Sequence, residues 1–224
     1  MTTVVKIGGA AAGAAAHVAR LAASGTGVVV VHGGGAQISD RCRAAGIEPV
    51  FVAGQRVTDT AVLEVVKEAL TEVGVELAAA IEAAGTPAQP IGGVVQAERY
   101  GHSALGLVGR VTAIDASPIA AVLASGAVPV VSPFAAGFNV NADHAAAAIA
   151  KGLGADELVF LSDVPGIVDA AGRVIQSITA AGAEALIGDG QVTGGMVPKV
   201  HAGLAALAGG VWRVRIGAET MVTA

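Results

Sequence analysis

Two glycine-rich segments of this chain carry residues that could hold an anion. Lys6 stands just before Gly8 and Gly9, and four valines run into His32 and the three glycines at 33–35. Glycine has no Cβ to block a phosphate or a carboxylate, and a helix that starts after such a turn aims free N–H groups at an anion. Short glycine motifs also recur by accident, so a flexible strand-to-helix turn and a solvated strand-end lysine are the alternative readings.

Two later segments add side chains suited to a carboxylate or to a pair of cations. Arg56 lies in a glycine-containing loop, residues 53–59, and its planar guanidinium can bind a carboxylate through two parallel hydrogen bonds. A surface ion pair is the alternative for this arginine. In residues 139–144, Asn141 is expected to cap a helix and Asp143 to lie in its first turn, where compensation of the helix dipole is the alternative role. Four alanines follow, which predicts that this helix packs closely on a sheet while its polar start faces a cleft.

Alternating strands and helices position these residues. Four consecutive valines are typical of a strand covered on both faces, as in parallel sheets. We expect strands at 3–7, 28–31, 48–52, 87–91, 127–132, 157–162 and 211–216, the last closing the sheet, and helices at 10–24, 36–45, 59–84, 117–125, 142–153, 179–187 and up to about 208. Residues 92–115 predict a β-hairpin over one face, suited to act as a lid. The fold class is therefore α/β, with an open, mostly parallel sheet that continues through both halves and helices on both faces.

Composition limits the kinds of partner. The 224 residues carry a formal charge of −5 without a basic cluster, which argues against nucleic acid. No apolar run approaches the roughly 20 residues of a membrane span, and the first residues lack the order of a signal peptide, so we expect a soluble, cytoplasmic protein. Cys42 is the only cysteine, which excludes an internal disulfide and a cysteine-based zinc site.

Six segments, in order along nearly the whole chain, resemble the motifs of the N-acetylglutamate kinases of the amino-acid kinase family. They are KIGG at 6–9, HGGG at 32–35, GQRVTD at 54–59, NVNAD at 139–143, LSDVPGI at 161–167 and GGMVPK at 194–199. The resemblance implies that residues 1–132 bind an acylamino acid and form the dimer, and that residues 133–224 bind ATP. It also implies transfer of the γ-phosphoryl group to the side-chain carboxylate of N-acetyl-L-glutamate, in arginine biosynthesis.

The resemblance assigns the site residues as well. Lys6 and Lys199 would converge on the moving phosphoryl group while Asp143 holds both ammonium groups in place. Substrate binding is implied for Gly34, Gly35, Arg56 and Asn139, and nucleotide binding for Gly8, Gly9, Asp163, Val164, Pro165, Gly166, Ile167, Val168, Gln191, Val192 and Thr193. A carboxylate is already ionised at pH 7, so no catalytic base is needed. Mg²⁺ would bridge the phosphates with few direct protein ligands, and no metal residue is assigned.

Three features depart from the family pattern. Gly74 stands where relatives commonly have asparagine, within a long helical segment. This difference bears on the stability of the helix and on the packing of a dimer built on it. The segment between Gly9 and Val28 is short, and Trp212 to Ile216 runs almost directly into Glu219 to Val222. Arginine-inhibited relatives carry an extra N-terminal helix that joins dimers into a hexamer. We therefore expect a homodimer on residues 59–84 without inhibition by arginine.

Two other functions remain open from the sequence. A related kinase could act on aminoadipate or glutamate attached to a carrier protein, but the chain lacks an evident basic rim for such a carrier. A non-catalytic regulatory relative is the other alternative, suggested by the shortened segments. Retention of Lys6, Asp143 and Lys199 together argues against it.

Overall fold

The computed structural model describes residues 1–8, 13–52 and 54–224. Gly9, which the sequence assigns to the nucleotide, lies outside these ranges. No helix in the described part of the chain is long and apolar enough to cross a membrane.

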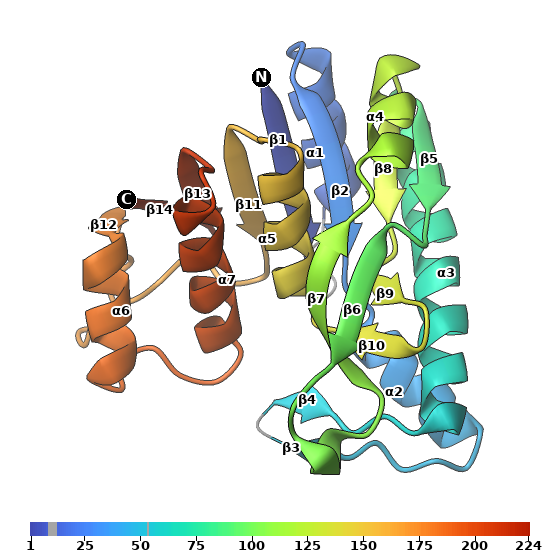
Figure 1. Ribbon diagram of the computed structural model, residues 1–224. Coiled ribbons are helices and arrows are strands. Elements are labelled where there is room, and N and C mark those ends of the chain that lie inside the picture. The colour runs from blue at the N-terminus through green and yellow to red at the C-terminus, as the bar shows by residue number, and fades with distance from the viewer. Residues whose placement is uncertain (9–12, 53) are drawn as a thin grey trace.

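An eight-stranded sheet runs through the molecule in the order β12-β14-β13-β11-β1-β2-β8-β5 (Figure 1). Neighbouring strands are parallel except β13 and β14. The bounds are β1 Thr2–Ile7, β2 Gly27–His32, β5 Ala88–Ile91, β8 Val128–Val131, β11 Glu157–Leu161, β12 Ser177–Thr179, β13 Arg213–Ile216 and β14 Thr220–Thr223. The four valines of β2 are fully buried, as a strand covered on both faces requires.

Helices cover both faces of this sheet, which confirms the expected fold class. The helices are α1 Ala14–Ala23, α2 Gly35–Ala44, α3 Thr60–Ala83, α4 Ser117–Ala124, α5 Ala142–Gly152, α6 Ala180–Gly188 and α7 Met196–Ala208. Helices α5 and α7 lie on one face of the sheet, and α1 and α3 lie on the opposite face (Figure 1). Buried side chains of α5 and α7 belong to one apolar cluster, and those of α1 and α3 belong to another. The small alanine side chains of α5 allow the helix to lie close to the sheet.

A smaller closed barrel lies beside one end of the main sheet. It consists of β6 Val95–Arg99, β7 Val108–Ile114, β9 Phe134–Ala135 and β10 Phe138–Val140. The antiparallel β6 and β7 confirm the hairpin expected within 92–115. Its tip is tied down, because Thr58 N–H donates to the Leu105 carbonyl at 3.0 Å and Leu107 N–H donates to the Thr58 carbonyl at 2.6 Å. The short strands β3 Phe51–Val52 and β4 Gln55–Arg56 form a separate hairpin.

The last predicted strand does not form the edge of the sheet, whereas the long predicted helix is continuous. Residues 211–216 do not close the sheet, because β14 and β12 lie beyond β13. The chain reverses at Gly217, whose φ of 64° favours glycine, and β14 then pairs with β13. The long helix α3 runs through Gly74 without a break, and Asp59 caps it by accepting a hydrogen bond from Val62 N–H at 2.8 Å.

Candidate active site

The end of β1, the start of α5 and the first turn of α7 bring three charged side chains into contact. Lys6 Nζ lies 2.8 Å from Asp143 Oδ1, and Lys199 Nζ lies 3.5 Å from Asp143 Oδ2. The exposed fractions of the three side chains are 7%, 17% and 8% for Lys6, Lys199 and Asp143. One carboxylate therefore stands between two ammonium groups, and the cluster keeps a net positive charge where water is largely excluded.

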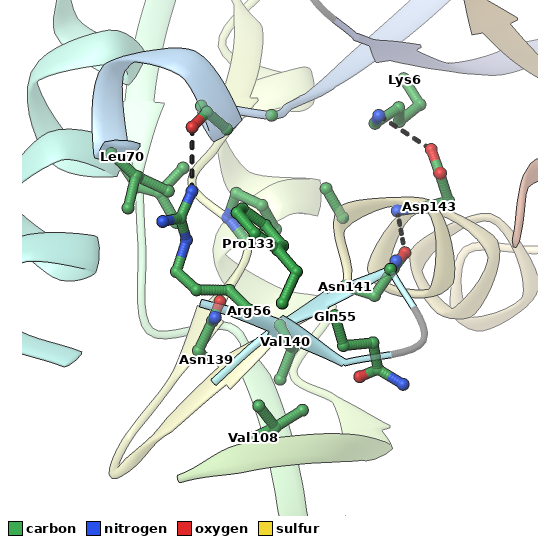
Figure 2. Close-up of a pocket in the computed structure, with 17 residues that line it drawn as sticks. Lys6, Gln55, Arg56, Leu70, Val108, Pro133, Asn139, Val140, Asn141 and Asp143 are labelled. Atoms are coloured by element: carbon green, nitrogen blue, oxygen red, sulfur yellow. Dashed lines mark hydrogen bonds and ion pairs between the residues drawn. The ribbon is translucent and has the colours of Figure 1, made fainter. Parts of the chain in front are cut away.

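The start of α5 fixes the position of Asp143. Asn141 caps the helix, and its side-chain oxygen accepts hydrogen bonds from Asp143 N–H at 2.8 Å and His144 N–H at 3.2 Å (Figure 2). The cap orients the first turn, and the positive end of the helix dipole favours a carboxylate there. Figure 2 shows Asp143 turned from this turn toward Lys6. The aspartate therefore compensates the dipole and also joins the two lysines.

Glycines beside the cluster leave room for Lys6 and for Leu70. A Cβ at Gly8 would lie 3.1 Å from Lys6 Nζ, and one at Gly34 would lie 2.9 Å from Leu70 Cδ2. Hydrogen bonds from Gly8 N–H to the Leu161 carbonyl at 3.0 Å and from Gly33 N–H to the Ile7 carbonyl at 2.9 Å hold the two turns against the sheet. The turns at the ends of β1 and β2 thus face each other across Lys6.

A cavity of about 220 Å³ opens beside this cluster. Its walls come from the turn after β2, the β3–β4 hairpin, β7, and the segment that leads into α5; they include Lys6, Gly34, Gly35, Arg56, Asn139 and Asp143. Figure 2 shows Arg56 and Asn139 on one side and Lys6 with Asp143 on the other. The cavity therefore brings together two of the three predicted catalytic residues, Lys6 and Asp143, and all four predicted substrate-binding residues.

Arg56 is held by one of its two terminal nitrogens. Nη2 donates to the Gly35 carbonyl at 3.0 Å and to Ser39 Oγ at 2.8 Å, and the guanidinium lies 4.7 Å from the centre of the Phe51 ring. Nη1 is buried and has no hydrogen-bond partner among the described residues. Burial lowers the pKa of Arg56, as expected for a desolvated cation. An anionic group in the cavity would supply the missing acceptor and offset this cost.

The amide of Asn139 is oriented by a buried hydroxyl. Thr58 Oγ1 donates to the Arg56 carbonyl at 2.9 Å, so the hydroxyl proton is used and the oxygen must accept from its other neighbour. Asn139 Nδ2 donates to it at 3.1 Å. This arrangement identifies the amide nitrogen as the atom bound to Thr58, and leaves Asn139 Oδ1 as an acceptor.

The residues that the sequence assigns to the nucleotide lie apart from this cavity. Residues 163–168 follow β11, and residues 191–193 connect α6 to α7. Val164 and Val168 are exposed, whereas Ile167 and Val192 are buried in the main apolar cluster. Ile167 N–H donates to Thr220 Oγ1 at 2.8 Å, which attaches the first of these loops to β14. The side chains of Ile167 and Val192 therefore pack the core, and a ligand there would meet their neighbours and backbone.

Sequence patterns did not indicate several residues that shape the site. Ser39 and Thr58 orient Arg56 and Asn139, and Phe51 lies against the guanidinium. Each contact depends on the fold, and an isolated serine, threonine or phenylalanine has no sequence signal that identifies its partner. Among the described residues, no group of three or more His, Cys, Asp or Glu side chains is placed to hold a metal ion.

We expect the free energy of unfolding to decrease as the pH falls from about 7.5 to 5.5. Burial is the main reason that the pKa values of His17, His32 and His144 lie below the usual 6.5. When the pH falls below about 6.5, these histidines bind more protons in the unfolded chain than in the folded chain. The free energy of unfolding therefore decreases until the pH reaches the pKa of the folded state. Urea unfolding should show a weaker pH dependence for His32→Asn than for the wild-type protein. A stability that rises on acidification would contradict this.

Comparison with known proteins gives similarity along the whole chain. The model of the amino acid kinase family matches residues 1–218. Acetylglutamate kinase from Koribacter versatilis is 42% identical over an alignment that covers 96% of this chain and 90% of that protein. Acetylglutamate kinase from Roseiflexus sp. is 40% identical, with coverages of 96% and 88%. Among solved structures, smu.665 from Streptococcus mutans UA159 has a TM-score of 0.91 and 29% identity, with coverages of 99% and 98%.

Proposed function

Because this chain belongs to the amino acid kinase family, we propose that it is an ATP-dependent acetylglutamate kinase of arginine biosynthesis. Its substrate would be N-acetyl-L-glutamate, phosphorylated on the side-chain carboxylate. The relatives named acetylglutamate kinase support this substrate. The observation that carries the mechanism is the Lys6–Asp143–Lys199 cluster at the edge of a cavity that also contains Arg56.

The cavity offers a separate contact for each polar group of the substrate. The free Nη1 of Arg56 is suited to the α-carboxylate, because a buried cation without a partner favours an anion. Asn139 Oδ1 can accept a hydrogen bond from the acylamino N–H. The N–H groups of Gly34 and Gly35, at the start of α2, then face the reacting side-chain carboxylate. Together these contacts would hold the carboxylate near Lys6.

The charged cluster would lower the barrier to transfer. An oxygen of the substrate carboxylate forms a bond to the γ-phosphorus while the bond from that phosphorus to the β–γ bridging oxygen breaks, giving an acyl phosphate and ADP. The main obstacle is repulsion between a carboxylate and a triphosphate, so directed positive groups matter more than a base. Lys6 would act from the substrate side and Lys199 from the nucleotide side. Asp143 would keep the two ammonium groups apart and aligned.

We assign ATP binding to residues 133–224 and substrate binding to residues 1–132, although Asn139 and Asp143 reach the cavity from beyond that boundary. Gly8 and the loops at 163–168 and 191–193 would contact the nucleotide. Mg²⁺ bound to the phosphates would neutralise part of their charge. Both oxygens of Asp143 contact lysines, which suits an ion held mainly by phosphates and water. Since ATP is the donor, we place the reaction in the cytoplasm.

A coupled assay of ADP release would test this function directly. The purified chain, ATP and Mg²⁺ should produce ADP with N-acetyl-L-glutamate, and much less with glutamate or aminoadipate at the same concentration. Trapping the acyl phosphate with hydroxylamine would show that ADP release reflects transfer to a carboxylate. A preference for aminoadipate would identify a different substrate, and the absence of activity with all three would favour a regulatory protein.

We also propose a two-fold homodimer that forms through the outer face of α3. Thr71, Val75 and Ala79 lie four residues apart on that face, and Val75 is 52% exposed. Light scattering should therefore report twice the chain mass of 21.6 kDa. Val75→Asp should shift the protein toward the monomer, because it places a charge in the interface. Val50→Asp, at an exposed valine outside α3, is the matched control. A dimer unaffected by Val75→Asp would place the interface elsewhere.

A further inference from the structure

A buried histidine stands directly behind the glycine turn of the cavity. His32 is the last residue of β2 and is 1% exposed. Its Nδ1 lies 3.1 Å from the Gly33 carbonyl oxygen, and its Nε2 lies 3.1 Å from Ser132 Oγ. Ser132 Oγ in turn lies 3.1 Å from the Leu70 carbonyl oxygen of α3. His32 does not line the cavity, so it cannot contact the substrate directly.

The number of available protons restricts this chain of contacts. A neutral imidazole has one N–H and a serine has one O–H, so only two of the three contacts can be hydrogen bonds. Burial lowers the pKa of His32, which keeps the ring neutral near pH 7. If Nε2 carried the proton, the lone pair of Nδ1 would face the Gly33 carbonyl. Placing the proton on Nδ1 removes that repulsion. Ser132 then donates either to Nε2 or to the Leu70 carbonyl, and this carbonyl already accepts a backbone hydrogen bond within α3.

Through the peptide between Gly33 and Gly34, the hydrogen bond to the Gly33 carbonyl also determines where the Gly34 N–H points. In a planar trans peptide, the carbonyl oxygen and the following N–H point in opposite directions. The carbonyl of Gly33 points into the interior toward His32, so the N–H of Gly34 points away from it. Gly34 lines the cavity. Within the described residues, this N–H donates no hydrogen bond to a backbone or side-chain oxygen.

We propose that His32 is a positioning residue: its Nδ1–H holds the Gly33 carbonyl and thereby aims the Gly34 N–H at the reacting carboxylate. The inference rests on the proposed function for the identity of that carboxylate. The residue would act on the transition state, where charge on the carboxylate and the phosphoryl oxygens is redistributed and a fixed donor is most effective.

The long helix α3 is shaped to accept this arrangement. A Cβ at Gly74 would lie 2.9 Å from Ser132 Oγ and 3.1 Å from His32 Nε2. Glycine at this position therefore allows the serine and the histidine to approach the helix. One turn earlier, Leu70 packs against Gly34, and its carbonyl oxygen lies 3.1 Å from Ser132 Oγ. The glycine that departs from the family pattern is thus accounted for by packing against His32.

Two replacements of His32 separate the two ring nitrogens. The amide nitrogen of His32→Asn can occupy roughly the place of Nδ1, whereas that of His32→Gln can occupy the place of Nε2. We expect His32→Gln to lower kcat about tenfold or more with a smaller change in KM for N-acetylglutamate, and His32→Asn to retain most of kcat. Ser132→Ala, which keeps the Nδ1 bond, should retain kcat even if it lowers the melting temperature. Equal loss in the Asn and Gln variants at equal stability would overturn the proposal.

A second measurement is independent of activity. Nitrogen NMR of the wild-type ring should show the proton on Nδ1 at pH 7, and the Gly34 amide signal should move more in His32→Gln than in Ser132→Ala. A proton on Nε2 would overturn the positioning role. If the wild-type protein fails to phosphorylate N-acetylglutamate while the ring has the expected tautomer, the proposed substrate is wrong and the orientation of the turn still stands.

Discussion

Replacing Lys6 or Lys199 by methionine is expected to lower kcat by about 10²–10³, the usual effect of removing one group that stabilises transition-state charge. Methionine keeps most of the length of the side chain but removes the ammonium group. Each charge matters most as the phosphoryl group moves, so KM for N-acetylglutamate and for ATP should change less than kcat. Steady-state kinetics with both substrates varied would measure this difference.

The two lysines should differ in their effect on stability. Lys6 lies 2.8 Å from Asp143 and is 7% exposed, whereas Lys199 lies 3.5 Å away and is 17% exposed. Breaking a buried ion pair costs roughly 3–5 kcal/mol because the remaining charge is left without its partner. Asp143 keeps one lysine in either variant, so the loss should stay below that range, and Lys6→Met should lose more than Lys199→Met.

Lys151→Met is the matched control for both variants. Lys151 is exposed in the last turn of α5, the helix that also provides Asp143. The same chemical change, made on the helix of Asp143 but away from the cluster, should leave kcat near the wild-type value. Unchanged turnover in Lys6→Met or Lys199→Met would show that the corresponding ammonium group does not assist transfer.

Much of this fold is encoded in local patterns. The buried valines of β2, the apolar spacing along residues 60–83 and the cap at Asn141 each follow from short-range preferences, and the structure confirms them. Strands that alternate with helices restrict the sheet to a mostly parallel arrangement. The polar residues at the ends of β1 and β2 could therefore be placed at one edge of the sheet without knowledge of side-chain contacts.

Short and irregular elements could not be predicted in the same way. The strands β9 and β10 have only two and three residues, and they form part of the small barrel through pairing with β6 and β7. β14 pairs with β13 after a tight reversal and is joined by β12, which lies about 40 positions earlier in the chain. Such pairings depend on tertiary packing, because three or four residues carry too little periodicity to identify a strand.

The side chains that orient the ligand-binding residues could also not be predicted from the sequence. Thr58 and Asn139 are 81 positions apart, and His32 and Ser132 are 100 apart. A threonine hydroxyl or a buried serine has no pattern that identifies its distant partner. The residues expected to contact ligands could thus be listed from motifs, whereas the residues that determine their orientation required the fold.

Arg56→Lys is expected to raise KM for N-acetylglutamate by about tenfold to a hundredfold, while KM for ATP changes little. The guanidinium presently uses Nη2 to bind the Gly35 carbonyl and Ser39 Oγ, which leaves Nη1 for a ligand. A lysine has a single nitrogen, so it can either hold the turn or reach the carboxylate. Because the positive charge is retained, the substitution tests whether binding needs the two terminal nitrogens of the planar guanidinium.

Arg41→Lys provides the control, because Arg41 is an exposed arginine on α2 that pairs with Glu72 on α3. It should leave both KM values unchanged, since a lysine can still form an exposed ion pair and such pairs contribute little. Isothermal titration of both variants with N-acetylglutamate, and separately with a non-hydrolysable ATP analogue, would measure binding without turnover. If Arg56→Lys instead weakened the binding of the nucleotide and left that of N-acetylglutamate unchanged, the assignment of the two ligands would have to be reversed. The cavity beside Arg56 would then hold the phosphates.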